Sequence, residues 1–230
     1  MANSTTTASK DGYSRFEQGI ELVTISGYFI AVACVFFLVR SYVVISPLSF
    51  VFAVLLGLLF ADFGTGFVHW FGDTWGKSSW PIVGRAFIRP FREHHVDEKA
   101  ITRHGFVETN GTISFLTLPV ALIALYFARS GSNKSFVAIF LASATIFGFW
   151  TNQFHKWAHS LRAPWYARIL QRSGLILNPK HHRLHHKQPF VDNYSITNGW
   201  TNYITGPVRF YRFLEWCACK VLRAQPRAEA

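Results

Sequence analysis

The sequence predicts an all-α integral membrane protein in which four transmembrane helices carry a histidine-rich cap, on the cytosolic side, that holds two metal ions. Three observations lead to this prediction. Half of the 230 residues are hydrophobic and 15% are charged, whereas soluble domains carry about 25% charged residues. Four apolar runs are long enough to suggest bilayer spans, for which a helix needs about 20 residues. All ten histidines lie outside these runs, between His69 and His186.

The expected spans come in two pairs. They cover residues 22–39, 43–61, 111–128 and 136–150. Pro47 interrupts the second span, which neighbouring helices tolerate in lipid. The fourth span is short and is expected to continue as a helix beyond Trp150. A soluble chain of this length rarely carries four such runs, so a bundle of buried helices in a soluble protein is the less favoured reading.

The chain length predicts one domain with a short tail at each end. The first 18 residues are polar and carry no signal-peptide pattern, so we expect a tail there. Residues 19–203 are expected to form the membrane domain, and residues 204–230 a basic tail.

Positive charge is strongly biased to one side of the expected membrane topology. Four spans place both tails, the loop between the second and third spans and the C-terminal third on the same side. All but three of the 23 Lys and Arg residues fall there, the exceptions being Arg40, Arg129 and Lys134. Because positively charged segments stay in the cytosol, every histidine is expected to face the cytosol. Anionic headgroups then account for the net charge of +11, and no nucleic-acid partner is expected.

The second span leads into the first histidine motif, ADFGTGFVHWFGDTWG, in which His69 and Asp73 are four residues apart on one helix face. Such a pair can hold one cation, although a histidine hydrogen-bonded to a carboxylate would give the same spacing. The following loop contains the adjacent pair His94 and His95, and His104 further on. Adjacent histidines point about 100° apart on a helix and could serve two metals. Exposure to solvent is the alternative for such a pair taken alone.

The fourth span leads into a second helical pair, His155 and His159. Two spans that each deliver such a pair to the same side are harder to explain without a metal. The last motif, NPKHHRLHH, is embedded among apolar and aromatic residues and is not a low-complexity tract. It places His182, His185 and His186 on one side of a short helix. Together the motifs predict metal binding.

The ligand types indicate iron. The three cysteines form no CxxC pair, so zinc ribbons and iron–sulfur clusters are excluded. A single zinc ion uses three or four ligands, whereas eight or more histidines with a carboxylate suit two six-coordinate irons that leave positions open for O2. Iron and O2 beside a bilayer favour oxidation of a lipid C–H bond. The residues therefore predict a lipid desaturase or hydroxylase.

With these motifs, the chain resembles the membrane lipid-desaturase family, in particular its ether-lipid branch. The family also includes bacterial light-response homologues and the plant plastid desaturase of phosphatidylglycerol. The resemblance is dense from Ala61 to Tyr203 and looser in the spans. It implies a di-iron centre held by the family's four boxes, which correspond here to His69, Asp73, His94, His95, His155, His159, His182, His185 and His186.

The resemblance also implies an oxidoreductase activity. Two hydrogens would be removed from the 1-O-alkyl chain of plasmanylethanolamine, and the resulting vinyl ether would make the lipid a plasmalogen. O2 would be the co-substrate, and NADH would supply electrons through a reductase and a b-type cytochrome. His104 and His181 match the ether-lipid branch, whereas the segment QPFVDNY (188–194) is closer to the plant branch. Headgroup preference and the position of the double bond therefore stay open.

Other polar residues are expected around the ligands or at the substrate headgroup. Within NPKHHRLHH, helical spacing allows His181 to pair with His185 or His182 to pair with His186, and the shared HxxHH box favours His182. We expect His181 and His104 to orient a ligand or to contact the headgroup. Candidates to hold the lipid phosphate are Arg89, Arg92, Arg103, Lys180 and Arg183.

Two alternative functions remain at this stage. An acyl-lipid desaturase or a lipid hydroxylase could use the same di-iron site. A membrane metal transporter or sensor would require ionisable residues in the middle of the spans, and the sequence has none there. The membrane is expected to be the endoplasmic reticulum in a eukaryote or the inner membrane in a bacterium.

Overall fold

The computed structural model describes residues 14–42, 45–81, 83–131 and 134–226, and all regular structure in these ranges is helical. Of the tail expected at residues 1–18, residues 1–13 lie outside the described ranges and residues 15–18 belong to the first helix. The start of the second span at 43–44 and the last four residues also lie outside the described ranges. In chain order the elements are α1 (Arg15–Tyr42), α2 (Pro47–Thr74), the π-helical turn η2 (Gly84–Ile88), α3 (Arg89–Val96), α4 (Ala100–Arg103), α5 (Phe106–Arg129), α6 (Ser135–His159), α7 (Trp165–Arg172), α8 (Pro179–His185), α9 (Asn202–Thr205) and α10 (Phe210–Val221).

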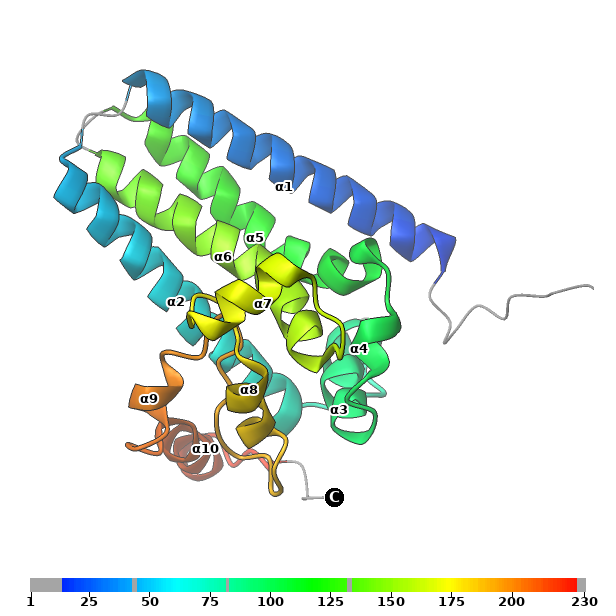
Figure 1. Ribbon diagram of the computed structural model, residues 1–230. Coiled ribbons are helices and arrows are strands. Elements are labelled where there is room, and N and C mark those ends of the chain that lie inside the picture. The colour runs from blue at the N-terminus through cyan, green and yellow to red at the C-terminus, as the bar shows by residue number, and fades with distance from the viewer. Residues whose placement is uncertain (1–13, 43–44, 82, 132–133, 227–230) are drawn as a thin grey trace, which may run out of the picture.

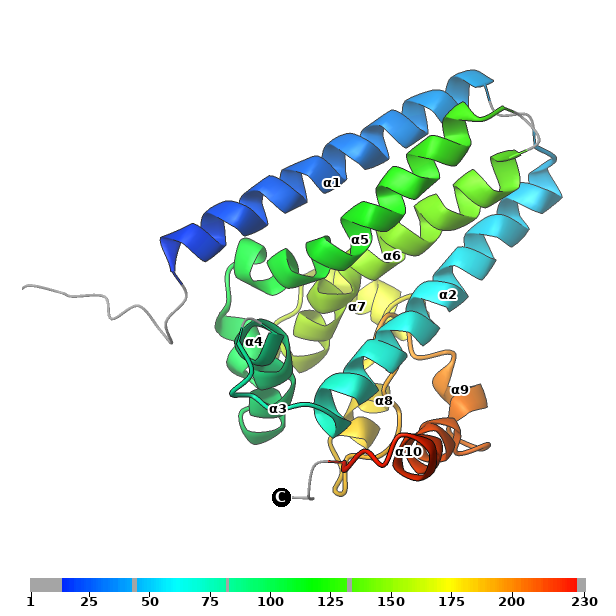
Figure 2. The same cartoon turned by 180° about the vertical axis from the view of Figure 1, so that it is seen from behind.

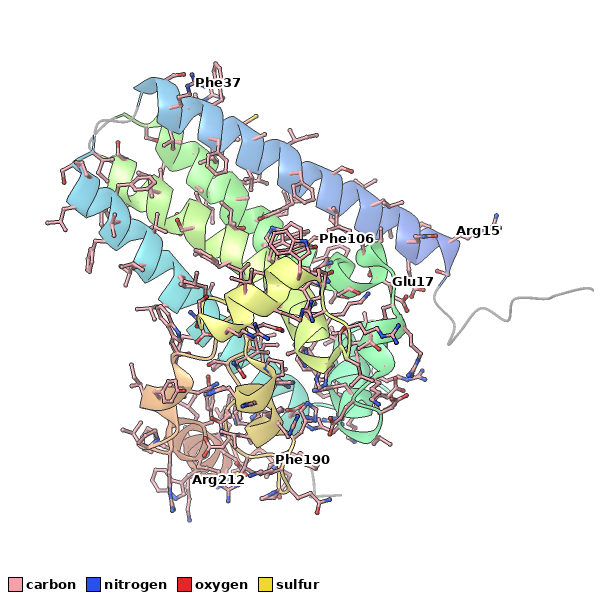
Figure 3. The ribbon with its side chains drawn as sticks, viewed as in Figure 1. Arg15, Glu17, Phe37, Phe106, Phe190 and Arg212 are labelled. Atoms are coloured by element: carbon pink, nitrogen blue, oxygen red, sulfur yellow. The ribbon has the colours of Figure 1, made fainter. Side chains whose placement is uncertain are left out.

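Four of the described helices, α1, α2, α5 and α6, are long and apolar enough to cross a membrane. They run side by side, with α1 against α5, α5 against α6 and α6 against α2 (Figures 1 and 2). The prediction of an all-α chain with four membrane spans is thereby confirmed. Figure 3 shows Phe37 and Arg15 at opposite ends of α1, and the shorter helices gather at the Arg15 end of the bundle.

Small side chains allow the four long helices to pack closely. Ala121, Ala124 and Ala138 are fully buried between them. A Cβ atom on Gly57 of α2 would lie 2.6 Å from Ser143 Cβ of α6, so this contact requires glycine. Close backbone approach of this kind is how helices associate in lipid, where apolar side chains gain little by leaving the solvent.

The long helices extend beyond their apolar runs, and this extension builds the site. The sequence suggested that Pro47 interrupts the second span. In the structure Pro47 instead occupies the first turn of α2. Ser46 caps that turn by accepting a hydrogen bond from the Ser49 amide. At the other end α2 continues to Thr74 and α6 continues to His159. Both helices thus carry their histidines past the apolar segment on continuous backbone.

The C-terminal part of the chain differs from the tail expected at 204–230. Residues 210–221 form α10, and Tyr211 is buried in a cluster with Trp70, Trp75 and Tyr194. The basic composition of this segment indicated a tail, but Tyr211 packs against apolar side chains of α2 and of the loop after α8, which are distant in sequence. The folded domain therefore continues past residue 203.

Candidate metal centre

Four elements bring the predicted ligands to one place in the cap. The last turn and a half of α2 carries His69 and Asp73, α3 carries His94 and His95, and the end of α6 carries His155 and His159. Helix α8 and the residue that follows it supply the remaining three: His182, His185 and His186. All eight of these histidines lie in two groups whose candidate ligand atoms are within 4.8 Å of one another. Figures 1 and 2 show α3 and α8 beside the end of α2.

The first group, here called the five-histidine cluster, contains His94, His155, His159, His182 and His186. The Nε2 atom of His182 lies 2.8 Å from that of His155, 2.9 Å from that of His159 and 3.0 Å from that of His186. A proton on one Nε2 atom can form a hydrogen bond in only one of these three contacts. In the other contacts the lone pairs of two nitrogen atoms face each other. A metal ion between the nitrogens removes this repulsion.

The distances between the imidazole nitrogen atoms can be compared with those between ligands of one metal ion. With a metal–nitrogen bond of about 2.1 Å, two ligands at right angles lie about 3.0 Å apart, and two tetrahedral ligands lie about 3.4 Å apart. The values of 2.8–3.0 Å in the five-histidine cluster are closer to the right-angled arrangement. Nitrogen atoms at these separations can bind one shared metal ion.

The second group, the four-histidine cluster, contains His69, His94, His95 and His185 and surrounds Asp73. The Oδ2 atom of Asp73 lies 3.1 Å from His95 Nε2 and 3.4 Å from the Nε2 atoms of His69 and His185. The carboxylate thereby adds an oxygen ligand and a negative charge to this cluster. The other carboxylate oxygen, Oδ1, is buried and has no hydrogen-bond partner among the described residues.

Backbone carbonyls orient three of the imidazoles. The Nδ1 atom of His69 lies 3.0 Å from the Tyr194 carbonyl, that of His94 lies 2.6 Å from the Phe91 carbonyl, and that of His185 lies 2.8 Å from the Asp192 carbonyl. A carbonyl only accepts, so Nδ1 carries the proton and donates. Each ring then turns an unprotonated Nε2 inward, where it is buried without a hydrogen-bond partner in the described structure. Metal-binding histidines are held in this way, so the donor set fits metal ions.

Burial keeps the imidazoles of His94, His182 and His186 neutral, which is the form that binds metal. Burial lowers the pKa of His94 and of His182 well below the ordinary value, and neighbouring imidazoles add to the shift. Burial also lowers the pKa of His186 to about 2. Protons therefore do not compete with a metal for these nitrogens near neutral pH.

His94 belongs to both clusters but can serve only one ion. Its Nδ1–H is engaged with the Phe91 carbonyl, so a single lone pair on Nε2 remains. The sequence suggested that the adjacent histidines could bridge two metals. In the structure, His95 faces Asp73 whereas His94 lies between the two clusters, with its ring 4.9 Å from that of His186 and 5.5 Å from that of His69.

Comparison with known proteins identifies the family of this chain. A model of the lipid desaturase domain matches residues 58–229, a range that contains every residue of both clusters. The chain belongs to the lipid desaturase family. No solved structure matches this lipid desaturase.

Two similar proteins are plasmanylethanolamine desaturases. The one from Myxococcus xanthus is 54% identical over 168 residues, which are 71% of this chain and 60% of that protein. Plasmanylethanolamine desaturase 1 of Mus musculus is 45% identical over 185 residues, or 78% of this chain and 68% of the mouse protein. A chloroplastic fatty acid desaturase 4-like protein of Arabidopsis thaliana is 32% identical over 69% of this chain and 53% of its own length. The aligned part of this lipid desaturase therefore spans less than two thirds of the Myxococcus relative.

The residues expected around the ligands are distributed differently. His181 lies outside both clusters, and its Nε2 is 3.0 Å from the Asn202 side-chain amide. His104 also lies outside them, 3.5 Å from Glu108. Arg92 donates to the carbonyls of Trp75 and Gly76 just after α2, at 2.8 Å each.

The other cations expected at the lipid phosphate have varied surroundings. Arg89 forms an ion pair with Glu93, and Arg103 forms one with Asp97. Arg183 is exposed on α8. Arg89, Arg92 and Arg103 thus have acceptors within the protein, whereas Lys180 lines a cavity.

Asp62 is a functional residue whose role the sequence did not reveal. It is fully buried on α2, and its Oδ1 accepts from the amides of Thr197, Asn198 and Gly199 at 2.9–3.1 Å. Its Oδ2 accepts from the amide and the hydroxyl of Thr201 at 2.9 and 2.7 Å. The available signal was an aspartate at the end of an apolar span, where a charge is costly unless it has partners.

The hydrogen bonds of Asp62 hold the loop that orients two ligands. The loop after α8 provides the Asp192 carbonyl for His185 and the Tyr194 carbonyl for His69. A Cβ atom on Gly66, one turn along α2 from Asp62, would lie 2.3 Å from Ser195 Oγ, so the loop packs directly on the α2 backbone. Asp62 thus positions His69 and His185 through this loop.

Proposed function

We propose that this lipid desaturase introduces the vinyl-ether double bond into the 1-O-alkyl chain of plasmanylethanolamine. The observation that carries the proposal is the pair of buried histidine clusters within a region that is 54% and 45% identical to two proteins named plasmanylethanolamine desaturase. An alkyl ether, O2, two electrons and two protons would give a vinyl ether and two molecules of water. The electrons would come from NADH through a reductase and a b-type cytochrome.

Two iron ions are the cofactors that we propose for the clusters. His155, His159, His182 and His186 would hold one ion, and His69, Asp73, His95 and His185 would hold the other, with His94 joining one of the two. Bound iron would supply the activation of O2 that removal of unactivated hydrogens requires. The donor set contains nitrogen and oxygen atoms but no thiolate. Non-haem iron sites that activate O2 use the same donor atoms.

The protein's own residues orient the ligands and exclude water. The Tyr194 and Asp192 carbonyls fix two imidazoles, and Asp62 holds the loop that carries those carbonyls. Aromatic rings cover the four-histidine cluster. Phe91 lies 5.1 Å from the His69 ring, Phe190 lies 4.6 Å from the His95 ring, and Tyr194 lies 5.1 Å from the His185 ring. Figure 3 shows Phe190 in the cap beside α8. These rings would keep water away from reactive oxygen species.

The decisive experiment is expression in cells that lack plasmalogens and are fed a 1-O-alkyl lipid. Acid-labile vinyl ethers should appear with the wild-type chain and not with His185→Ala, the matched inactive control. New double bonds in acyl chains, or hydroxylated chains, without vinyl ethers would instead indicate an acyl-lipid desaturase or a hydroxylase. Accumulation of metal without any change in lipids would indicate a transporter or sensor.

Elemental analysis should find close to two iron atoms per chain and little zinc. The physical reason is the number of ligands, since eight histidines and one aspartate exceed what one ion can use. Inductively coupled plasma mass spectrometry of protein purified without added metal measures both elements. One zinc per chain with no iron would contradict the di-iron proposal.

The cap is proposed to face the cytosol, in the endoplasmic reticulum membrane of a eukaryote or the inner membrane of a bacterium. Single cysteines can test this after Cys34, Cys217 and Cys219 are replaced by alanine. When the chain is expressed in a bacterium, a membrane-impermeant maleimide should label Lys77→Cys and Lys187→Cys only after permeabilisation. Ser130→Cys, at the other end of the bundle, should be labelled in intact cells. Labelling in the reverse pattern would invert the topology.

A further inference from the structure

A second polar cavity lies on the other side of α8 from the histidine clusters. Its volume is about 490 Å³, within the usual range for small-molecule sites. His182 and His185 face the clusters from α8, whereas Lys180, His181 and Leu184 of the same helix line this cavity. The end of α7, the loop before α9 and α9 itself add Gln171, Arg172, Asn198, Trp200 and Tyr203 to the lining.

Two buried amide groups in the lining lack acceptors. The exposed fractions of Gln171 and Asn198 are 4% and 5%, and neither Gln171 Nε2 nor Asn198 Nδ2 has a hydrogen-bond partner among the described residues. The orientation of Asn198 is fixed, because its Oδ1 accepts from the Trp200 amide at 3.1 Å. Unsatisfied buried donors are costly. Both nitrogen atoms are shielded from solvent in the structure, so these two amides contribute to the polar wall behind the cavity surface.

The charges around the cavity have one sign. Arg172 and Lys180 line it, and the described residues of the lining include no carboxylate. His181 adds a neutral donor. Its Nε2 accepts from Asn202 Nδ2 at 3.0 Å, since Asn202 Oδ1 already accepts from the Ser195 amide, so the proton of the neutral ring is on Nδ1. Two cations and several N–H groups are suited to a phosphate group.

Helix α7, which contributes Gln171 and Arg172 to the cavity lining, has the composition of a helix at a membrane surface. Helix α7 carries the exposed side chains of Trp165, Tyr166 and Ile169 together with Arg168 and Arg172. A short helix with exposed aromatic and cationic residues is typical of the headgroup level of a bilayer. Both ribbon views place α7 where the long helices meet the cap (Figures 1 and 2). A lipid headgroup can therefore reach the cavity from the membrane.

We propose that this cavity binds the phosphodiester headgroup of the phospholipid substrate. The inference rests on the proposed function and assigns the substrate's headgroup to a specific place. Arg172 and Lys180 bind the phosphate oxygens, and the Trp200 and Tyr203 rings lie beside the ammonium group of the ethanolamine. Because α8 carries metal ligands on one side and lines this cavity on the other, a headgroup bound here would be separated from the metal centre by one helix.

Steady-state kinetics of the iron-loaded protein provides the first test. Arg172→Gln and Lys180→Gln should each raise KM for the 1-O-alkyl lipid about tenfold, the usual effect of losing one charged hydrogen bond. The kcat and the iron content should not change. Arg168→Gln, from the same face of α7, and Lys187→Gln, after α8, are matched controls that should retain the wild-type KM. Unchanged KM in Arg172→Gln and Lys180→Gln, with normal turnover, would overturn the headgroup site and leave the proposed function intact.

Binding measured without turnover provides the second test. Native mass spectrometry under anaerobic conditions, in maltoside detergent, compares 1-O-alkyl-2-acylglycerophosphoethanolamine with the corresponding glycerol lipid that lacks the phosphate. The phosphate-bearing lipid should bind more tightly to the wild type, and this preference should disappear in the Arg172→Gln/Lys180→Gln double variant. If the preference disappears as expected but the wild type forms no vinyl ether, the proposed function fails while the cavity remains a headgroup site.

Competition separates a lipid headgroup from free phosphate. Soluble glycerophosphoethanolamine should displace the bound lipid at concentrations at which inorganic phosphate has no effect. Displacement by inorganic phosphate with equal potency would show that the cavity recognises a free anion, and would overturn its assignment to the lipid.

Discussion

Replacing His182 with alanine is expected to empty the five-histidine cluster of metal and to reduce turnover below detection. The Nε2 atom of His182 lies within 3.0 Å of three other imidazole nitrogens, so no other side chain of the cluster can replace it. Iron content by elemental analysis and vinyl-ether formation by lipid analysis measure the two effects.

His181→Ala is the matched control for this prediction. His181 is the adjacent residue on α8 but lies outside both clusters, against the Asn202 amide. The variant should keep its iron and lose activity about 10–100-fold, the usual effect of removing a group that does not bind the metal directly. An iron-free His181→Ala protein beside an active, iron-replete His182→Ala protein would show that the other helical pair binds the metal.

Asp62→Asn should lower both the thermal stability and the iron content. The substitution replaces one acceptor oxygen with an NH2 group that faces the donors of Thr201. Asp62→Ala should be more severe, because four buried amides lose their acceptor, and each unsatisfied group costs about 1–3 kcal/mol. Such a sum is a large part of the 5–15 kcal/mol that stabilises a typical domain.

Thermal unfolding in detergent and elemental analysis together test the role of Asp62. Iron should be lost at temperatures at which the helices remain folded, because the loop that carries the Tyr194 and Asp192 carbonyls is released first. Glu215→Gln is the control, since Glu215 pairs with Arg212 near the surface and such pairs contribute about 0–1 kcal/mol. If Asp62→Asn binds iron as the wild type does, the loop does not depend on this carboxylate.

The sequence predicted the parts of the structure that depend on local patterns. Apolar runs located all four spans because a bilayer selects for length and composition. The pairs His69/Asp73 and His155/His159 were recognisable because residues four apart share a helix face. The start of α2 was misplaced because a proline in an apolar run can occupy either the middle or the first turn of a helix. Ser46 as the N-cap decides between them.

The remaining features depend on contacts between distant segments. Asp62 accepts hydrogen bonds from residues 135 to 139 positions away, which no local pattern encodes. The position of His94 between two clusters follows from how α3 packs beside α2 and α8. Tyr211 is buried because α10 folds back onto Trp70. Tertiary packing of this kind could not be read from composition or spacing.

In the proposed desaturase, the length of α2 would set which carbon atoms of a lipid can be oxidised. His69 is 22 residues beyond Pro47, which corresponds to about 33 Å of helix, and the hydrocarbon core of a bilayer is about 30 Å thick. With Pro47 at one surface of the membrane, a helix of this length would hold the proposed metal ligands at about the depth of the glycerol backbone. The first two carbons of a chain lie at that depth, whereas a carbon in the middle of the chain would have to travel about 10 Å or more toward the membrane surface. Inserting one helical turn into α2 before Asp62 would displace the proposed metal ligands by about 5.4 Å along the helix axis.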